Sequence, residues 1–211
     1  MSLGIIRVLT TTDDRVLGEH GRLLERDYGI RSLSRCIPDQ PRGIHDAQTE
    51  ALAIPKILAL GREFEAAGCR ALFLSCAADP GLAQLRQAVR IPVFSAGSSA
   101  ARIAQHLALP VAVLGITAEA PAPFRSLLGE SVVYARPEGV TCTNDLLQPD
   151  GRERAVACVR RLMDEGARVI AFSCTGFSTI GLAAVLREEL GCVAIDAVAA
   201  AGMFASEALA A

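Results

Sequence analysis

The sequence contains no tryptophan, and aromatic residues make up only 4% of its 211 residues. Aromatic platforms on which nucleic-acid bases stack are therefore not expected. The formal net charge is −2, and no run of five residues with the same charge occurs. Neither a nucleic acid nor a membrane surface is an expected partner of a chain with this charge pattern.

Long apolar runs are also missing. No run reaches the ~18 residues of a membrane span, and Asp196 and Glu207 interrupt the most apolar stretch, residues 192–211. A basic segment followed by a long apolar one is absent near the start, which argues against secretion. The seven cysteines lack the spacing of a disulfide framework. We therefore expect reduced thiols and a cytoplasmic protein.

The usual signatures of metals and cofactors are absent. There is no Cys-x-x-Cys motif, and the three histidines are scattered, so neither a zinc site nor a thioredoxin-type site is expected. No Gly-x-Gly-x-x-Gly or Walker-type sequence is present, so a dinucleotide or nucleoside triphosphate ligand is not expected.

Short apolar runs alternate with helical segments along the whole chain, and apolar residues make up 51% of it. Continuous apolar runs are typical of parallel strands buried on both faces. The predicted strands are 5–10, 32–37, 71–75, 92–94, 111–115, 132–135, 169–173 and 193–195. The predicted helices are 14–28, 46–67 (kinked or split at Pro55), 81–89, 98–106, 122–128, 151–165, 180–190 and 197–209. This alternation predicts an α/β fold with parallel sheets, and we expect the loop 136–149 to decorate a site or a sheet edge.

An internal repeat relates the two halves of the chain. The segment Gly68-Cys-Arg-Ala-Leu-Phe-Leu-Ser-Cys76 matches Gly166-Ala-Arg-Val-Ile-Ala-Phe-Ser-Cys174, 98 residues later. A short loop and then Gly-Leu-Ala follow each cysteine, at Gly81 and at Gly181. A repeat of this length predicts duplicated lobes rather than a solenoid.

The repeat also predicts where the functional site lies. We expect a first α/β lobe over residues 1–96, a second over 97–196, and a C-terminal helix 197–211 that packs back on the first lobe. Ligands of open parallel sheets bind beyond the carboxyl ends of the strands. Each half places a cysteine at that end, so two facing lobes would present Cys76 and Cys174 to one cleft.

Two such thiols suit the inversion of a stereocentre without a cofactor. A thiolate on one face removes a proton, and a thiol on the other face donates one. A nearby helix N-terminus is expected to lower the pKa of each thiol toward neutrality, and its N–H groups to hold an anionic oxygen. The other five cysteines are interpreted as small buried hydrophobic residues: Cys36, Cys69, Cys142, Cys158 and Cys192.

Other polar residues near predicted strand ends have two interpretations each. Asp13, Asp14, Asp79 and Asp196 either cap helices or serve the site. Thr11 and Thr117 either form ordinary turns or donate hydrogen bonds to a substrate.

At Ser75-Cys-Ala-Ala-Asp-Pro80, Ser173-Cys-Thr-Gly-Phe-Ser-Thr179 and Ile195-Asp-Ala-Val198, the sequence resembles the Asp/Glu/hydantoin racemase superfamily. The resemblance covers nearly the whole chain. It implies two Rossmann-like lobes with the active site between them, Cys76 and Cys174 as the acid/base pair, and no metal or cofactor. The expected partner is a small-molecule substrate, and we expect a homo-oligomer.

The resemblance is strongest to the hydantoin racemase branch, which has a similar Cys-x-x-Asp-Pro motif. Gly176 stands where amino-acid racemases tend to place His or Glu, which favours a 5-substituted hydantoin or a related cyclic ureide such as allantoin. The chain departs from that branch at Thr10-Thr-Thr-Asp13, where an Asn-Pro-Asn-like turn is usual. The proposed substrate-binding residues are Thr11, Gln40, Ala77, Ala78, Thr117, Thr175 and Gly176.

Alternative functions remain open on the same scaffold. An Asp or Glu racemase and a maleate isomerase-like enzyme both retain two cysteines, whereas an arylmalonate decarboxylase-like enzyme needs only one. An alternative of another class is a non-catalytic protein that binds a small ligand and has structural cysteines.

Overall fold

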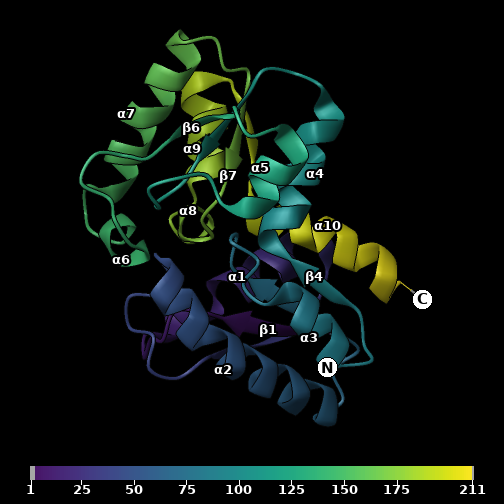
Figure 1. The fold of residues 1–211 in the computed structure, drawn as a ribbon. Coiled ribbons are helices and arrows are strands. Elements are labelled where there is room, and N and C mark those ends of the chain that lie inside the picture. Colours follow the sequence, from purple (N-terminus) through teal and green to yellow (C-terminus); the bar gives the residue numbers. More distant parts are fainter. Residues whose placement is uncertain (1–2, 211) are drawn as a thin grey trace.

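The computed structural model describes residues 3–210. The chain forms two four-stranded parallel sheets, each covered by helices, which lie one above the other in Figure 1. This arrangement confirms the predicted α/β fold with two lobes. Residues 1 and 2 of the predicted first lobe and residue 211 of the predicted C-terminal helix lie outside the described residues.

The lower lobe in Figure 1 contains the first sheet, in the order β2-β1-β3-β4. Its strands are β1 (Leu3–Arg7), β2 (Ser32–Cys36), β3 (Ala71–Ser75) and β4 (Val93–Ser95). Its helices are α1 (Asp14–Tyr28), α2 (Ala47–Ala66) and α3 (Leu82–Ala88).

The upper lobe repeats this topology, in the order β6-β5-β7-β8. Its strands are β5 (Val111–Leu114), β6 (Val133–Ala135), β7 (Val169–Phe172) and β8 (Val193–Ile195). Its helices are α4 (Ala96–Leu107), α5 (Ala122–Leu128), α6 (Thr143–Leu146), α7 (Gly151–Asp164), α8 (Gly176–Thr179) and α9 (Leu182–Leu190). The sequence repeat therefore corresponds to two sheets with the same strand order.

Alternating side chains explain why the strands are continuous apolar runs. Ile6 and Leu72 lie in a cluster with Phe64 of α2, on one face of the first sheet. Ile5 and Phe73, one residue along each strand, lie in the larger core that continues into the second lobe. Because successive strand residues point to opposite faces, both faces of the central strands β1 and β3 are buried, whereas the edge strand β2 is only partly buried.

Helix α10 (Ala197–Leu209) lies where the two lobes meet and packs against α1, α4, β3 and β4 (Figure 1). Its approach to α1 is close, because a Cβ added at Gly202 would lie 2.5 Å from Leu24 and 2.7 Å from Tyr28. A side chain at this position would force Leu24 or Tyr28 to shift, so glycine permits the close approach. The division of the lobes at residues 96 and 97 stays a prediction.

Three helices differ from the sequence prediction. The segment 180–190 starts later, because Gly181 adopts a left-handed conformation (φ 66°) that separates α8 from α9. The loop 136–149 contains the short helix α6. Helix α2 runs through Pro55 as one element, so of the two alternatives, a kinked helix or two helices, the second is excluded. The carbonyl of Ala51 loses its helical partner at that proline, but Ala51 is exposed and water can solvate it.

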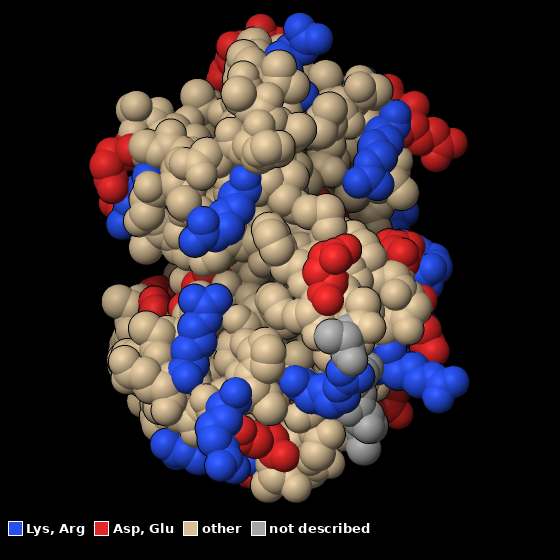
Figure 2. Space-filling model, turned by 90° about the vertical axis from the view of Figure 1, so that its right-hand side faces the viewer, with Lys and Arg blue, Asp and Glu red and all other residues tan. Residues whose placement is uncertain are grey.

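On the face shown in Figure 2, Lys and Arg side chains lie interspersed with Asp and Glu side chains. An indentation separates the upper and lower halves of this face. Within residues 3–210, no helix is long and apolar enough to cross a bilayer.

Candidate active site

The two cysteines of the repeat occupy matching positions in the fold. Cys76 directly follows β3, and Cys174 lies two residues after the end of β7. Each of these strands pairs with the first strand of its sheet, β1 or β5. These neighbours mark the point where the strand order reverses, which is where ligands of open parallel sheets bind. Both cysteines are nearly buried, at 8% and 7% exposure.

A backbone N–H two residues downstream faces each sulfur. The amide of Gly176 donates to Cys174 Sγ at 3.3 Å, and the amide of Ala78 hydrogen-bonds to Cys76. Donation to sulfur favours the thiolate over the thiol. Four of the predicted substrate-binding residues, Ala77, Ala78, Thr175 and Gly176, therefore lie in the two cysteine loops, where Ala78 and Gly176 contact the thiols themselves.

The Cys76 loop is fixed by Asp79, whose backbone is left-handed at φ 55°. Its carboxylate accepts hydrogen bonds from Ser95 Oγ at 2.9 Å and from the amides of Gly97 and Ser98, both at 2.8 Å. The Ser98 hydroxyl also donates to it. Asp79 thus satisfies the first turn of α4 and ties the cysteine loop to it, which is the capping role.

The Cys174 loop is fixed by Asp196 at the end of β8. This carboxylate accepts from Ser178 Oγ at 2.7 Å and from the amides of Val198 and Ala199, at 2.8 and 3.0 Å. It therefore caps α10 and holds α8, which begins directly after the Cys174 loop. Asp13 likewise caps α1 through the amide of Arg15, so capping describes these three aspartates.

Helix α6 brings one further group to Cys174. Thr143 Oγ1 lies 3.8 Å from Cys174 Sγ, within hydrogen-bonding range for sulfur. A Cβ at Gly176 would lie 3.0 Å from both Leu146 and Thr143, so the absence of a side chain there lets α6 approach. The sequence marked the loop 136–149 as decorating a site or an edge but did not single out Thr143.

Burial raises the pKa of both thiols above that of a free cysteine. The prediction of a pKa lowered toward neutrality is therefore wrong in direction. The cause is that desolvation of the charged form outweighs the single backbone N–H at each sulfur. The two thiols also influence each other electrostatically, because a negative charge on Cys174 further raises the pKa of Cys76.

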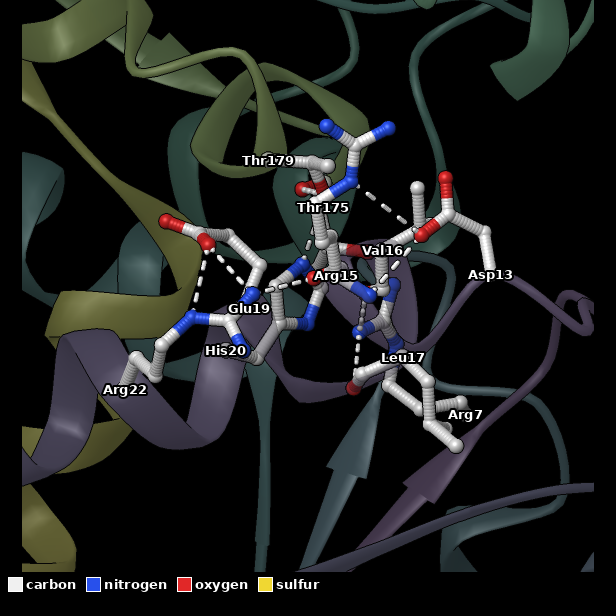
Figure 3. A network of polar contacts seen from close by, with 10 residues as sticks. All are labelled: Arg7, Asp13, Arg15, Val16, Leu17, Glu19, His20, Arg22, Thr175 and Thr179. Carbon is white, nitrogen blue, oxygen red and sulfur yellow. Dashed lines mark hydrogen bonds and ion pairs between the residues drawn. The ribbon is translucent and has the colours of Figure 1, made fainter.

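Arg7, the last residue of β1, places a buried positive charge near Cys174. Its Nη1 donates to the carbonyls of Val16 and Leu17 at 2.8 and 3.0 Å (Figure 3). Burial lowers the pKa of Arg7 to about 10, so it stays charged at neutral pH, and its charge lowers the pKa of Cys174. The sequence analysis missed this residue, although a charged residue inside an otherwise apolar strand run was the available signal.

The remaining predicted substrate-binding residues are engaged in their own loops. Thr11 Oγ1 accepts from the amide of Asp13 at 3.1 Å, which is turn chemistry. The Gln40 side chain donates to the carbonyl of Thr49 at 2.8 Å. Thr117 Oγ1 donates to the Glu119 carbonyl at 2.7 Å and lies 3.1 Å from the hydroxyl of Tyr134.

Tyr134 is a second side chain that the sequence analysis missed. Its hydroxyl donates to the carbonyl of Thr117 at 2.9 Å. Burial raises its pKa, and the charge of Cys174 raises it further, which places the phenol near that thiol. Among residues 3–210, no group of three or more His, Cys, Asp or Glu side chains is arranged to hold a metal ion.

Comparison with known proteins gives the family. The model of the Asp/Glu/hydantoin racemase family matches residues 27–205. A hydantoin racemase from Rhizobium meliloti is 27% identical over 189 residues, which are 77% of this chain and 70% of the relative.

Solved structures agree in fold. The allantoin racemase from Klebsiella pneumoniae has a TM-score of 0.84 at 24% identity, covering 100% of this chain and 88% of that chain. The allantoin racemase from Pseudomonas fluorescens has a TM-score of 0.81 at 17% identity, covering 100% and 91%. Together with the paired cysteine loops, the family match shows that the chain belongs to the Asp/Glu/hydantoin racemase family and is an isomerase of the racemase type.

Proposed function

We propose that this racemase inverts the stereocentre of a 5-substituted hydantoin, or of a related cyclic ureide such as allantoin, using Cys76 and Cys174 as its two acid/base groups. The reaction needs no cofactor or metal in this proposal, and its substrate is a small molecule of the cytoplasm. The observation that carries the proposal is the matched placement of the two nearly buried thiols, one at the end of each central strand, each facing a backbone N–H.

The two cysteines supply both proton transfers that the inversion requires. The thiolate of one cysteine takes the proton from the stereogenic carbon, so that an S–H bond forms as the C–H bond breaks. The electron pair passes to the adjacent carbonyl, giving an enolate. The thiol of the other cysteine then donates its proton to the opposite face, which leaves the two sulfurs with exchanged protonation states. Loop backbone around Ala77 and Thr175 is proposed to hold the substrate carbonyls.

Three observations support a ureide. The proton at C5 of a hydantoin is far more acidic than the α-proton of a zwitterionic amino acid, so it demands less of a site whose thiols are hard to ionise. Gly176 provides no side chain that would assist removal of a less acidic proton. The similar proteins named above are described as hydantoin and allantoin racemases.

One observation favours a second candidate, an aspartate or glutamate racemase. Arg7 supplies a buried positive charge near Cys174, although no Arg or Lys lies within two residues of either cysteine in the sequence. Such a charge would suit an α-carboxylate. Against this, Nη1 of Arg7 already binds two carbonyls of α1.

A direct comparison of substrates tests the proposal. The protein is incubated under reducing conditions in deuterium oxide with enantiopure hydantoins, allantoin, L-Glu and L-Asp. Loss of the α-proton signal and of optical rotation is followed for each, and kcat/KM is compared. We expect a clear preference for a cyclic ureide. A preference for a free amino acid contradicts the substrate assignment, and equal rates for wild type and a Cys76→Ala, Cys174→Ala double variant contradict the mechanism.

A further inference from the structure

A fully buried histidine joins the two lobes beside the cysteine loops. His20 lies on α1 and has 0% exposure. Its Nδ1 lies 2.7 Å from Ser75 Oγ in the first lobe. Its Nε2 lies 2.9 Å from Thr179 Oγ1 in the second lobe (Figure 3). No step of the proposed reaction uses this residue.

Both partners of His20 are close to a reacting sulfur along the chain. Ser75 directly precedes Cys76, and Thr179 ends α8, the helix that begins directly after the Cys174 loop. A second contact joins the same loops, because Thr175 Oγ1 donates to the carbonyl of Ser75 at 3.4 Å. The cysteine loops of the two lobes are therefore connected twice, directly through Thr175 and through the imidazole ring of His20.

The imidazole ring of His20 is neutral, so it can accept one hydrogen bond and donate another. It thereby holds its two partners at a fixed distance. Burial and the charge of Arg7 hold the pKa of His20 well below its usual value. One nitrogen then donates and the other accepts. Thr179 Oγ1 is also within 3.4 Å of the Thr175 carbonyl, to which it donates. This pattern fits a ring whose Nε2–H donates to Thr179 and whose Nδ1 accepts from Ser75.

We propose that His20 is a positioning residue that fixes the separation of Cys76 and Cys174, through its hydrogen bond to Thr179 across the lobes. The inference rests on the proposed two-thiol mechanism. Inversion requires both sulfurs to be aligned with one carbon at the same time, whereas proton removal requires only one. Loosening the link between the lobes should therefore impair inversion more than proton removal.

The test compares Thr179→Val, which keeps the shape of the side chain and loses the hydroxyl, with Thr179→Ser, which keeps the hydroxyl. The readout is the ratio of α-proton exchange to inversion for an enantiopure hydantoin in deuterium oxide, together with kcat and KM. Thr141→Val is the matched control, because it removes one hydroxyl that binds Asp145 within the second lobe only.

For Thr179→Val we expect inversion to fall roughly three- to tenfold, the fold-change that corresponds to one lost hydrogen bond. KM should change little, and the ratio of exchange to inversion should rise, because the carbanion forms but is reprotonated on the original face. Thr179→Ser and Thr141→Val should retain the wild-type ratio. His20→Asn, which retains a polar group near Ser75 but is too short to reach Thr179, should behave as Thr179→Val does.

An unchanged ratio in a folded Thr179→Val variant overturns the inference, as does an equal loss of exchange and inversion, which would indicate a structural role alone. If His20→Asn does not fold, Thr179→Val decides. Failure of the proposed function looks different, because Cys76→Ala and Cys174→Ala would then retain inversion whatever the Thr179 variants do.

Discussion

The two cysteine loops share a backbone design but differ in what surrounds the sulfur. In both, an amide two residues downstream faces the thiol, and a left-handed glycine farther along the chain, Gly81 or Gly181, caps the start of α3 or α9. The carboxylates of Asp79 and Glu50 raise the pKa of Cys76, whereas no carboxylate is among the main influences on Cys174.

Cys174 instead has two groups that favour its thiolate, Arg7 and Thr143. The two halves thus share the position of the sulfur but differ in the electrostatics around it. Both thiols are protonated at neutral pH because burial raises both pKa values, and Cys174 should be the one that loses its proton more readily.

An Asp–Ser hydrogen bond fixes each cysteine loop, but the two residues have exchanged places between the lobes. In the first lobe the aspartate lies in the cysteine loop and a serine, Ser95, ends the last strand. In the second lobe the serine, Ser178, follows the cysteine and Asp196 follows the last strand. The requirement is one buried Asp–Ser hydrogen bond between loop and strand end, and either element can supply the carboxylate.

Replacement of the thiols should have the largest effect. Cys76→Ala and Cys174→Ala should each lower the racemisation rate by ~10²–10⁴-fold, the range for loss of a positioned acid or base. Cys192→Ala, a buried cysteine outside the two loops, is the control and should retain activity. Near wild-type racemisation by either loop variant would show that the two halves are not partners in one reaction.

Loss of an aspartate anchor should come next. Asp79→Ala leaves the amides of Gly97 and Ser98 without their acceptor, and Asp196→Ala does the same to Val198 and Ala199. We expect each to lower the free energy of unfolding by about 2–3 kcal/mol, measured by urea denaturation. Asp→Asn variants keep an acceptor and should lose less. A large loss of unfolding free energy for only one of the two Asp→Ala variants would show that the two aspartates do not have equivalent roles.

Thiol ionisation should separate the two cysteines. Because burial raises both pKa values, the thiolate fraction at pH 7 is small, and alkylation by iodoacetamide should accelerate as the pH rises from 7 to 9. Cys174 should react several-fold faster than Cys76. Their exposures of 7% and 8% are nearly equal, so access does not explain a difference. Peptide mass spectrometry resolves the two sites, and faster labelling of Cys76 would contradict the assignment of Cys174 as the thiol that ionises more readily.

The smallest expected effect concerns Thr143. Thr143→Val removes a hydrogen bond to Cys174 and should raise the pKa of that thiol, so its alkylation at pH 7 should slow about two- to fivefold. Alkylation of Cys76 should stay unchanged, and Thr143→Ser should resemble wild type. Equal slowing at both thiols would indicate a general change in access.

Local patterns in the sequence were enough to locate the strands and to place Cys76 and Cys174, although the first strand, predicted over residues 5–10, spans Leu3–Arg7. Apolar runs mark buried strands, and the repeat marks equivalent strand ends, so both inferences depend on residues adjacent in the chain. Side chains that come to the site from distant parts of the sequence were not predicted. Arg7 and His20 lie more than fifty residues before Cys76, and only folding brings them to the cysteine loops.

The pKa of the thiols could not be predicted for the same reason. A helix start can be inferred from local sequence, but the desolvation that dominates here arises from both lobes packing around the sulfur. For Gln40 the local sequence suggested a role that the structure does not support. Its position after a strand predicted a substrate contact, whereas its side chain donates a hydrogen bond to the carbonyl of Thr49.

The stereochemistry of proton exchange in the two single-cysteine variants tests the central claim most directly. Each enantiomer of a 5-substituted hydantoin is incubated separately with Cys76→Ala and with Cys174→Ala in deuterium oxide, and loss of the α-proton is followed before inversion accumulates. If the thiols work on opposite faces, each variant should exchange one enantiomer only, and the two variants should exchange opposite ones. Exchange of the same enantiomer by both variants would contradict the account.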